Sequence, residues 1–462
     1  MVRKRLVFCF DGTWQKLAQP HPTNVAFTAE TVSPLANDGI PQPIFYNEGV
    51  GTDPRDKWTG GIFGLGLMKV LADAYRFLIF NYEPGDELFV FGFSRGAFTA
   101  RSFVGLVSNC GILDQRLAGK SGEVIDLYER RPQDKDKDTA KAKRYYEELA
   151  EYRGTYCTRV CVSDADDAWR VANLPDYEAG QAPFVSFGYV GVWDTVGALG
   201  VPHSLSISSF LNRRYQFHDL SLTTLVKAAR HAVAIDERRI DYAPTLWDNI
   251  DPLNAKRGFT SDQIDAPYQQ KWFPGNHGSV GGGGDRRGLS DQALEWIWDG
   301  ARKAGLGLDT AHDSLIYGLE PNPLEYLINT SPPKFKRIGD WVDELQRRAD
   351  RSPGPKQLYE VSAMARLRWK VPGDRLPDET DYRPPTLSAV RSNLDDLPEI
   401  NFDELPAGSY RLHVVQGGET LSAIAQSEYG DADKWRLIFD ANRSRIVSPD
   451  EIFIGQPIRI PI

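Results

Sequence analysis

Ser94 stands in residues 92–96, Gly-Phe-Ser-Arg-Gly, which match the G-x-S-x-G pattern of a nucleophile elbow. An apolar run at 88–91 comes before it, and a helix-forming pattern at 97–107 follows. The two glycines allow a turn sharp enough to expose a serine hydroxyl at the tip of a strand. The spacing therefore predicts a serine nucleophile, and with it a serine hydrolase.

A serine nucleophile needs a histidine to remove its proton and a carboxylate to orient that histidine. In α/β-hydrolases the three residues follow in the order Ser, Asp, His. The acid candidate is Asp194, because the apolar run 184–193 ends there and small turn residues follow. The ends of parallel strands are where open α/β sheets carry functional groups. The alternative interpretation is a turn aspartate that caps a helix.

The candidate base is His277, in a segment rich in glycine at 275–284 that follows an apolar pair. We expect such a loop to let the imidazole approach Ser94 without crowding from side chains. One alternative is a flexible surface loop that carries an incidental histidine. The competing base is His231, which we expect in the middle of a helix among apolar neighbours, where a hydrogen-bonded core histidine is the better interpretation.

A tetrahedral intermediate also needs two N–H donors for its oxyanion. The amide of Arg95, directly after the nucleophile, is the first candidate. Gly12 or Thr13, after a first strand at 6–10, is the candidate for the second. Residues 11–13, Asp-Gly-Thr, are similar to a phosphatase nucleophile motif, but Cys9 occupies the position of the attacking aspartate, so that chemistry is lost. We predict no cofactor and no metal site.

These residues require a sheet that holds them at one edge. Apolar runs at 6–10, 88–91 and 184–193 predict strands, and the patterns at 67–81, 97–107 and 222–234 predict helices. Strands that are apolar throughout and alternate with helices indicate a parallel sheet covered on both faces. We therefore predict an α/β-hydrolase-like fold, with a mostly parallel sheet flanked by helices.

The composition excludes several classes of protein. The chain has 462 residues and a formal net charge of −9, which argues against nucleic acid as the main partner. Four scattered cysteines do not suggest a disulfide framework. The apolar segment at 6–10 is too short for a signal peptide, and no run of about 18 apolar residues could span a membrane. We predict synthesis in the cytoplasm without a leader.

The chain divides into three parts. We predict a catalytic domain at 1–387, an acidic, proline-containing linker at 388–409, and a small βααβ module at 410–462. In the module we expect strands at 410–415 and 458–461 around two helices. Thr420 is placed to cap the first helix, and its small core is expected to contain Leu421, Ile424, Trp435 and Ile438.

Five blocks in the first domain together resemble the catalytic-domain family of type VI secretion phospholipase effectors. These blocks lie at 8–14, 46–52, 92–101, 192–197 and around His277. The resemblance implies an α/β-hydrolase that cleaves fatty-acyl esters of membrane phospholipids, with Ser94, Asp194 and His277 matching the family's triad. Two departures are visible: many members carry Asn where this chain has Gln15, and Asp where it has Ser279.

The module at 410–462 resembles a LysM domain over its whole length. This resemblance implies binding of N-acetylglucosamine polymers such as peptidoglycan in a shallow groove. The groove residues that it implies are Gly418, Thr420, Leu421, Asn442 and Ile446. LysM modules can instead serve in assembly, and that alternative stays open.

The leading hypothesis is a phospholipase of A type that acts through a Ser-His-Asp triad and an acyl-enzyme. The resemblance further implies export without a leader, action at a membrane surface, and contact with secretion machinery or an immunity protein. One alternative is a soluble carboxylesterase or thioesterase. The other is a binding or assembly protein that is anchored by its LysM module and has no catalytic activity.

Overall fold

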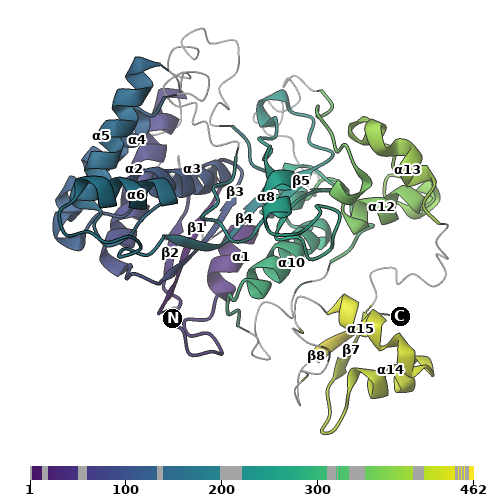
Figure 1. Ribbon diagram of the computed structural model, residues 1–462. Coiled ribbons are helices and arrows are strands. Elements are labelled where there is room, and N and C mark those ends of the chain that lie inside the picture. Colours follow the sequence, from purple (N-terminus) through teal and green to yellow (C-terminus); the bar gives the residue numbers. More distant parts are fainter. Residues whose placement is uncertain are drawn as a thin grey trace. The chain divides into compact units, whose positions relative to one another are not determined.

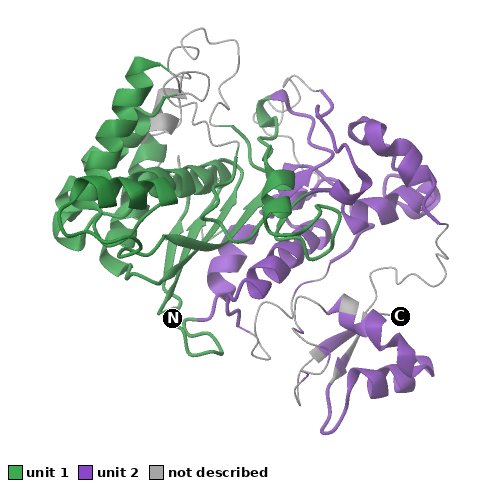
Figure 2. Cartoon of the chain, in the orientation of Figure 1, with its two compact units in different colours: residues 1–20, 34–231, 241–270 green, residues 21–33, 232–240, 271–462 purple. Residues whose placement is uncertain are grey.

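A computed structural model describes most of the chain, and its residues group into two compact units (Figure 2). The described residues are 3–12, 19–49, 60–132, 139–197, 221–309, 319, 321–331, 349–398, 410–442, 446, 449, 452 and 457–461. Unit 1 comprises residues 1–20, 34–231 and 241–270, and unit 2 comprises 21–33, 232–240 and 271–462.

A mostly parallel six-stranded sheet has the strand order β2-β1-β3-β4-β5-β6. Its strands are β1 (Arg5–Phe10), β2 (Ile44–Asn47), β3 (Glu87–Phe93), β4 (Ser186–Trp193), β5 (Ala229–Ala234) and β6 (Tyr268–Phe273). β1 pairs in parallel with both β2 and β3, and β3 pairs in parallel with β4. Every residue of β1 and β3 is buried, as a sheet covered on both faces requires. The predicted α/β fold is confirmed.

The helices of unit 1 pack against this sheet or against one another. They are α2 (Gly60–Asn81), α3 (Arg95–Cys110), α4 (Ser121–Glu129), α5 (Ala140–Tyr156), α6 (Asp164–Asn173) and α8 (Ile250–Lys256), with a 3-10 turn η2 (Gln115–Lys120). Figure 1 shows α3 lying along β1, β3 and β4, which it contacts. One apolar cluster joins α2, α3, α4 and α5 to the strands. In the sheet β3 lies next to β1, and β3 ends directly before the candidate nucleophile, Ser94.

One predicted element is wrong. The run 222–234, which we expected to be helical, contains the strand β5 at its end, and all six strand residues are buried. His231 therefore lies in a central strand and not in a helix. Because Arg230 and His231 are buried along with the apolar residues, apolar and polar residues do not alternate, and periodicity alone does not separate a strand from a helix.

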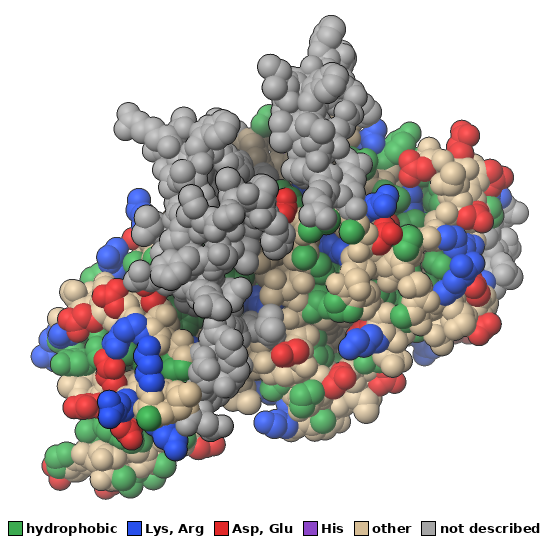
Figure 3. Space-filling view, turned by 90° about the horizontal axis from the view of Figure 1, so that it is seen from above, with side chains coloured by type: hydrophobic (Ala, Val, Ile, Leu, Met, Phe, Trp, Pro, Cys, Tyr) green, Lys and Arg blue, Asp and Glu red, His purple; other side chains and the backbone are tan. Residues whose placement is uncertain are grey.

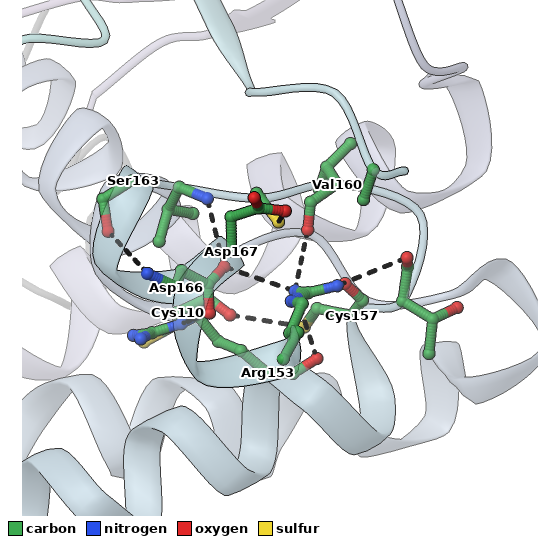
Figure 4. Close-up of polar contacts among 12 residues, drawn as sticks. Cys110, Arg153, Cys157, Val160, Ser163, Asp166 and Asp167 are labelled. Carbon is green, nitrogen blue, oxygen red and sulfur yellow. Dashed lines mark hydrogen bonds and ion pairs between the residues drawn. The ribbon is translucent and has the colours of Figure 1, made fainter. Parts of the chain in front are cut away.

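The helices α5 and α6 share a buried polar network in unit 1. On the helix α5, Arg153 donates through Nε to Asp166 Oδ1 at 2.8 Å. Arg170 donates to the same carboxylate and to the carbonyl oxygens of Cys157 and Val160 (Figure 4). Asp166 and Arg170 are buried, and this pairing offsets the cost of placing their charges there. All four cysteines are free and buried.

Unit 2 carries further helices that precede the C-terminal module. They are α1 (Asn24–Thr31), α9 (His277–Gly281), α10 (Gly288–Lys303), α12 (Ala363–Lys370) and α13 (Arg391–Asp395). The 3-10 turns of this unit are η6 (Leu358–Glu360), η7 (Gly373–Arg375) and η8 (Pro385–Val390). A further 3-10 turn, η4 (Ile240–Tyr242), has residues in both units. The start of the predicted linker thus belongs to η8 and α13, with Val390 and Leu394 buried. The linker limits stay a prediction.

The C-terminal module has the predicted βααβ order. It consists of β7 (Tyr410–Val414), α14 (Leu421–Tyr429), the 3-10 turn η9 (Ala432–Lys434), α15 (Trp435–Ala441) and β8 (Pro457–Pro461), and the two strands pair antiparallel. The Thr420 side chain caps α14 by accepting the Ala423 amide at 3.1 Å. Leu421, Ile424 and Ile438 lie in a separate small core, with Trp435 packed against it.

Two surface properties bear on possible partners. Lys and Arg side chains are interspersed with Asp and Glu on the described part of the face in Figure 3, so positively charged side chains do not form a large patch there. Among the described residues, no helix combines the length and apolar character needed to cross a membrane.

Candidate active site

Ser94 sits at the turn between β3 and α3, the strand–turn–helix arrangement that its motif predicts. Its backbone has φ 60° and ψ −126°, a conformation that is costly for a residue with a side chain. The turn is held because the Ser94 amide donates to the Trp193 carbonyl at 3.0 Å and the Ser94 carbonyl accepts from Phe98. Such strain persists only where the surrounding fold imposes it, and it is typical of a nucleophile elbow.

The two glycines of the elbow are required by close packing. A Cβ atom on Gly92 would lie 2.6 Å from the Gly96 carbonyl oxygen. A Cβ atom on Gly96 would collide with the carbonyl oxygens of Phe10 and Asp11 at the end of β1. The first turn of α3 therefore rests directly on the chain that leaves β1, which brings the Arg95 amide and the β1 terminus to the same side of the elbow.

The end of β1 carries a buried carboxylate, Asp11. Its Oδ1 accepts the Gly12 amide at 2.6 Å, and its Oδ2 accepts the Tyr46 hydroxyl at 2.8 Å. Burial and then the Asp11 charge raise the pKa of Tyr46, so the phenol keeps its proton and donates. The Gly12 amide, a predicted oxyanion donor, is thus directed at Asp11. Thr13 lies outside the described residues, and Arg95 starts α3, where helix amides lack acceptors within the helix.

Asp194 follows β4 and is fully buried, with a positive φ of 37°. The next residue, Thr195, is anchored on both sides: its amide donates to His231 Nε2 at 3.2 Å, and its carbonyl accepts the Thr245 amide at 2.8 Å. The carboxylate therefore stands on a turn whose backbone is fixed.

His231 is the buried histidine that holds this turn. Because Nε2 accepts an amide hydrogen, the ring proton is assigned to Nδ1, which lies 2.9 Å from Gln270 Oε1. Gln270 Oε1 also accepts the Trp247 amide at 2.9 Å, and the Trp247 ring packs edge-on against the imidazole. The interpretation of His231 as a hydrogen-bonded core histidine is confirmed, although its helix is not.

His277 begins the short helix α9 in unit 2 and is buried. Asn276 caps this helix by accepting the Ser279 amide at 2.9 Å. The segment is packed so tightly that a side chain would not fit at Gly278: a Cβ atom there would lie 2.5 Å from the Asn329 side chain. Ser279 Oγ donates to the Leu327 carbonyl at 2.8 Å, so this departure from the family pattern has a structural role.

Two carboxylates just after β5, Asp236 and Glu237, were not identified as site residues from the sequence. Asp236 Oδ2 accepts the Gly275 amide at 2.7 Å and the Tyr382 hydroxyl at 2.8 Å. Burial raises the pKa of Asp236 to about 6, against the opposing effect of these two hydrogen bonds. Glu237 Oε2 accepts the His277 amide at 3.2 Å. The sequence does show an acidic pair directly after the apolar run 232–235. Because we expected that run to be helical, the pair was not placed at the end of a strand.

Glu237 is also held by Arg239. The Arg239 amide and Nε donate to Oε1, each at 2.8 Å, and Nη2 donates to Oε2 at 2.7 Å. Burial opposes ionisation of Glu237, but the hydrogen bonds and charge of Arg239, together with the charge of His277, hold its carboxyl pKa below the ordinary value. The described part of the chain contains no group of three His, Cys, Asp or Glu side chains suited to a metal ion.

The residues predicted to bind glycan divide into exposed and buried groups. Gly418 and Thr420 are exposed on the turn before α14. The side chains of Leu421 and Ile446 lie in the core of the module. The Asn442 side chain is buried and bonded to the Ile438 and Arg459 carbonyls. Only the first group offers side-chain or backbone surface to a ligand directly.

Residues 4–300 match the family model of the type VI secretion system (T6SS) phospholipase effector Tle1-like catalytic domain. The chain belongs to this family. Residues 413–461 match the LysM domain, so this Tle1-like chain carries a LysM module at its C-terminal side. Ser94, Asp194 and His277 fall inside the Tle1-like region, whereas Tyr382, which contacts Asp236, follows it.

Two curated relatives match parts of the Tle1-like chain. The uncharacterized protein YEL023C of Saccharomyces cerevisiae is 27% identical over 253 residues, which cover 51% of this chain and 31% of the yeast protein. Potassium binding protein Kbp of Escherichia coli O6:H1 is 45% identical over 95 residues, which cover 20% of this chain and 61% of Kbp. The chain thus spans less than two thirds of the length of either relative.

Two solved structures are also similar. The Tle1 effector bound to the VgrG spike of the type 6 secretion system is 15% identical, with a TM-score of 0.28, over 61% of this chain and 51% of the other. An uncharacterized protein from Pseudomonas aeruginosa is 14% identical, with a TM-score of 0.33, over 98% of this chain and 75% of the other.

Proposed function

We propose that this protein hydrolyses fatty-acyl ester bonds of phospholipids, with Ser94 as nucleophile, His277 as general base and Asp194 as the residue that orients the base. The observation that carries the proposal is the elbow: Ser94 has a strained backbone between a buried strand and a helix, in a chain of the Tle1-like phospholipase effector family. Asp194 follows β4 and His277 follows β6, strands of the same sheet as β3.

In this proposal the reaction has two steps. Ser94 Oγ attacks the ester carbonyl carbon while His277 takes the hydroxyl proton, and the intermediate collapses as the ester C–O bond breaks and His277 protonates the departing lysophospholipid alcohol. Water then attacks the acyl-Ser94 ester with His277 again as base. The fatty acid leaves, and the serine hydroxyl is restored. Asp194 stabilises the imidazolium that forms in each step.

The oxyanion needs N–H donors that are directed at it during the attack. The Arg95 amide, at the first position of α3, serves as one donor in this proposal. For the second donor, the contact between the Gly12 amide and Asp11 favours Thr13, since Gly12 would have to release a buried carboxylate. Both residues remain candidates from the same loop.

The substrate class is tested by comparing two ester types at equal concentrations of the ester bond. Phospholipid vesicles and a short-chain soluble ester are incubated with the protein, and released acids are quantified by mass spectrometry. We expect faster release from the vesicles. A preference for the soluble ester would favour the esterase or thioesterase alternative, and no release from either would favour a protein without catalytic activity.

We further propose that the LysM module binds polymers containing N-acetylglucosamine through the exposed turn at Gly418 and Thr420, and that the protein is a secreted effector. The match to the LysM family supports the first statement, and the Tle1-like family supports the second. Cosedimentation with insoluble peptidoglycan tests glycan binding. Equal cosedimentation of the full chain and a chain ending before residue 410 would favour the assembly role.

A further inference from the structure

A second carboxylate, just after the end of β5, accepts the backbone amide of the candidate base. We propose that Glu237 is a positioning residue for His277: it fixes the start of α9 and places a permanent negative charge beside the imidazole. The role of His277 as the base rests on the proposed function, whereas the contact between the two residues does not. Neither family pattern nor sequence spacing assigns a role to Glu237.

The Glu237 carboxylate has little freedom to move. It is 3% exposed, and four donors reach its two oxygens: the Arg239 amide, Nε and Nη2, and the His277 amide. A side chain with this many fixed partners orients the group that it contacts, since any rotation would break several charge-assisted hydrogen bonds at once. The His277 backbone is therefore tied to the end of β5.

The charge of Glu237 has a consequence for the imidazole as well. His277 lowers the pKa of Glu237, and by linkage the carboxylate favours the protonated form of His277 to the same degree. Arg239 weakens this stabilisation of the protonated imidazole, because its positive charge is paired with the same carboxylate. An imidazolium forms when a serine proton is taken up, so a nearby negative charge stabilises the charged intermediate.

Asp236 provides a matched comparison. It holds the same loop through the Gly275 amide, and the charged or titratable groups that act on it are Arg368, Arg351 and Tyr382. The groups that act on Glu237 are Arg239 and His277. Asp236→Asn keeps an oxygen for both of its hydrogen bonds, so it tests loss of a loop carboxylate on which Arg368 and Arg351, and not His277, are the main charges that act.

The experiment measures the pKa of His277 directly. The full chain is labelled with ¹³C at the histidine Cε1 position, and its NMR signal, identified by its absence in His277→Gln, is followed from pH 5 to pH 9. We expect the His277 pKa to fall by about one unit in Glu237→Gln. Glu237→Asp is expected to recover at least half of that fall, and Asp236→Asn to shift the pKa by less than a third of it.

A second variant gives a shift of opposite sign. Arg239→Gln keeps the Glu237 charge but removes the cation that opposes it, so the His277 pKa is expected to rise. Where the wild-type protein hydrolyses an ester, the acid limb of the pH profile of kcat/KM shifts with the same signs. Unchanged His277 pKa values in both Glu237→Gln and Arg239→Gln would overturn the inference, even if thermal unfolding showed that both variants were destabilised.

The outcome is independent of the proposed function. If the wild-type protein hydrolyses no ester, the proposed function fails while the NMR titration still decides whether Glu237 sets the charge of His277. If hydrolysis is observed and His277 does not respond, the inference fails and the proposed function stands.

Discussion

Ser94 and Asp194 share an uncommon backbone feature: both are non-glycine residues with positive φ, and both follow buried parallel strands. Strain of this kind costs about 1–3 kcal/mol for each residue and is retained where the surrounding structure fixes it. Here the fixing contacts are the Trp193 carbonyl for Ser94 and, through Thr195, His231 for Asp194. Two side chains are thus presented at fixed angles at the ends of adjacent strands.

Asp236 makes folding stability depend on pH. Its ordinary pKa is 3.8, and burial raises the pKa in the folded protein to about 6. Between these values the folded state binds the proton more tightly than the unfolded state, so the free energy of unfolding falls as pH rises and the full cost is present above about pH 6.

We therefore expect Asp236→Asn to stabilise the protein by about 3 kcal/mol at pH 7 and by less than about 1 kcal/mol at pH 4. Urea unfolding at the two pH values, monitored by tryptophan fluorescence, provides the measurement. Equal effects of the substitution at pH 4 and pH 7 would show that the carboxyl titrates normally in the folded state.

At the scale of elements, the nucleophile elbow was predictable and the histidine environment was only partly so. Residues 92–96 specify their turn through two glycines whose Cβ atoms would meet backbone, a local requirement that a single sequence displays. The strand β5 was missed because all six of its residues are buried, Arg230 and His231 included, so apolar and polar residues do not alternate along it. Asp236 and Glu237 were missed for the same reason. Their contacts with Gly275 and His277 join segments about 40 residues apart in the sequence. No local pattern encodes such a pairing.

The elbow also makes a prediction about packing. Gly96→Ala places a Cβ atom against two backbone carbonyls at the end of β1, so we expect a loss of about 3 kcal/mol in the free energy of unfolding. The matched control is Gly122→Ala on the exposed side of α4, where nothing lies within 4 Å of the added atom; it should gain about 0.5 kcal/mol. Chemical denaturation of both variants gives the comparison, and equal effects would contradict the packing argument.

At the scale of the whole molecule, the chain joins a Tle1-like catalytic region to a LysM module with its own hydrophobic core. The order of elements in the module was predicted closely because small modules depend on local signals: a capping threonine, two short apolar helices and terminal strands. The segment at 349–395 was less predictable. Its contacts with the end of β5, through Tyr382 and Thr386, are visible only in the fold.

We propose that the whole chain acts on membrane phospholipids and that Ser94 attacks their acyl esters. The most direct measurement is the fatty acid released from mixed phospholipid vesicles by the wild-type protein, by Ser94→Ala, and by Ser102→Ala as a control for a buried serine elsewhere on α3. We predict release by the wild type and by Ser102→Ala, and a loss of at least 10³-fold in Ser94→Ala. Equal release by the wild type and Ser94→Ala would contradict it.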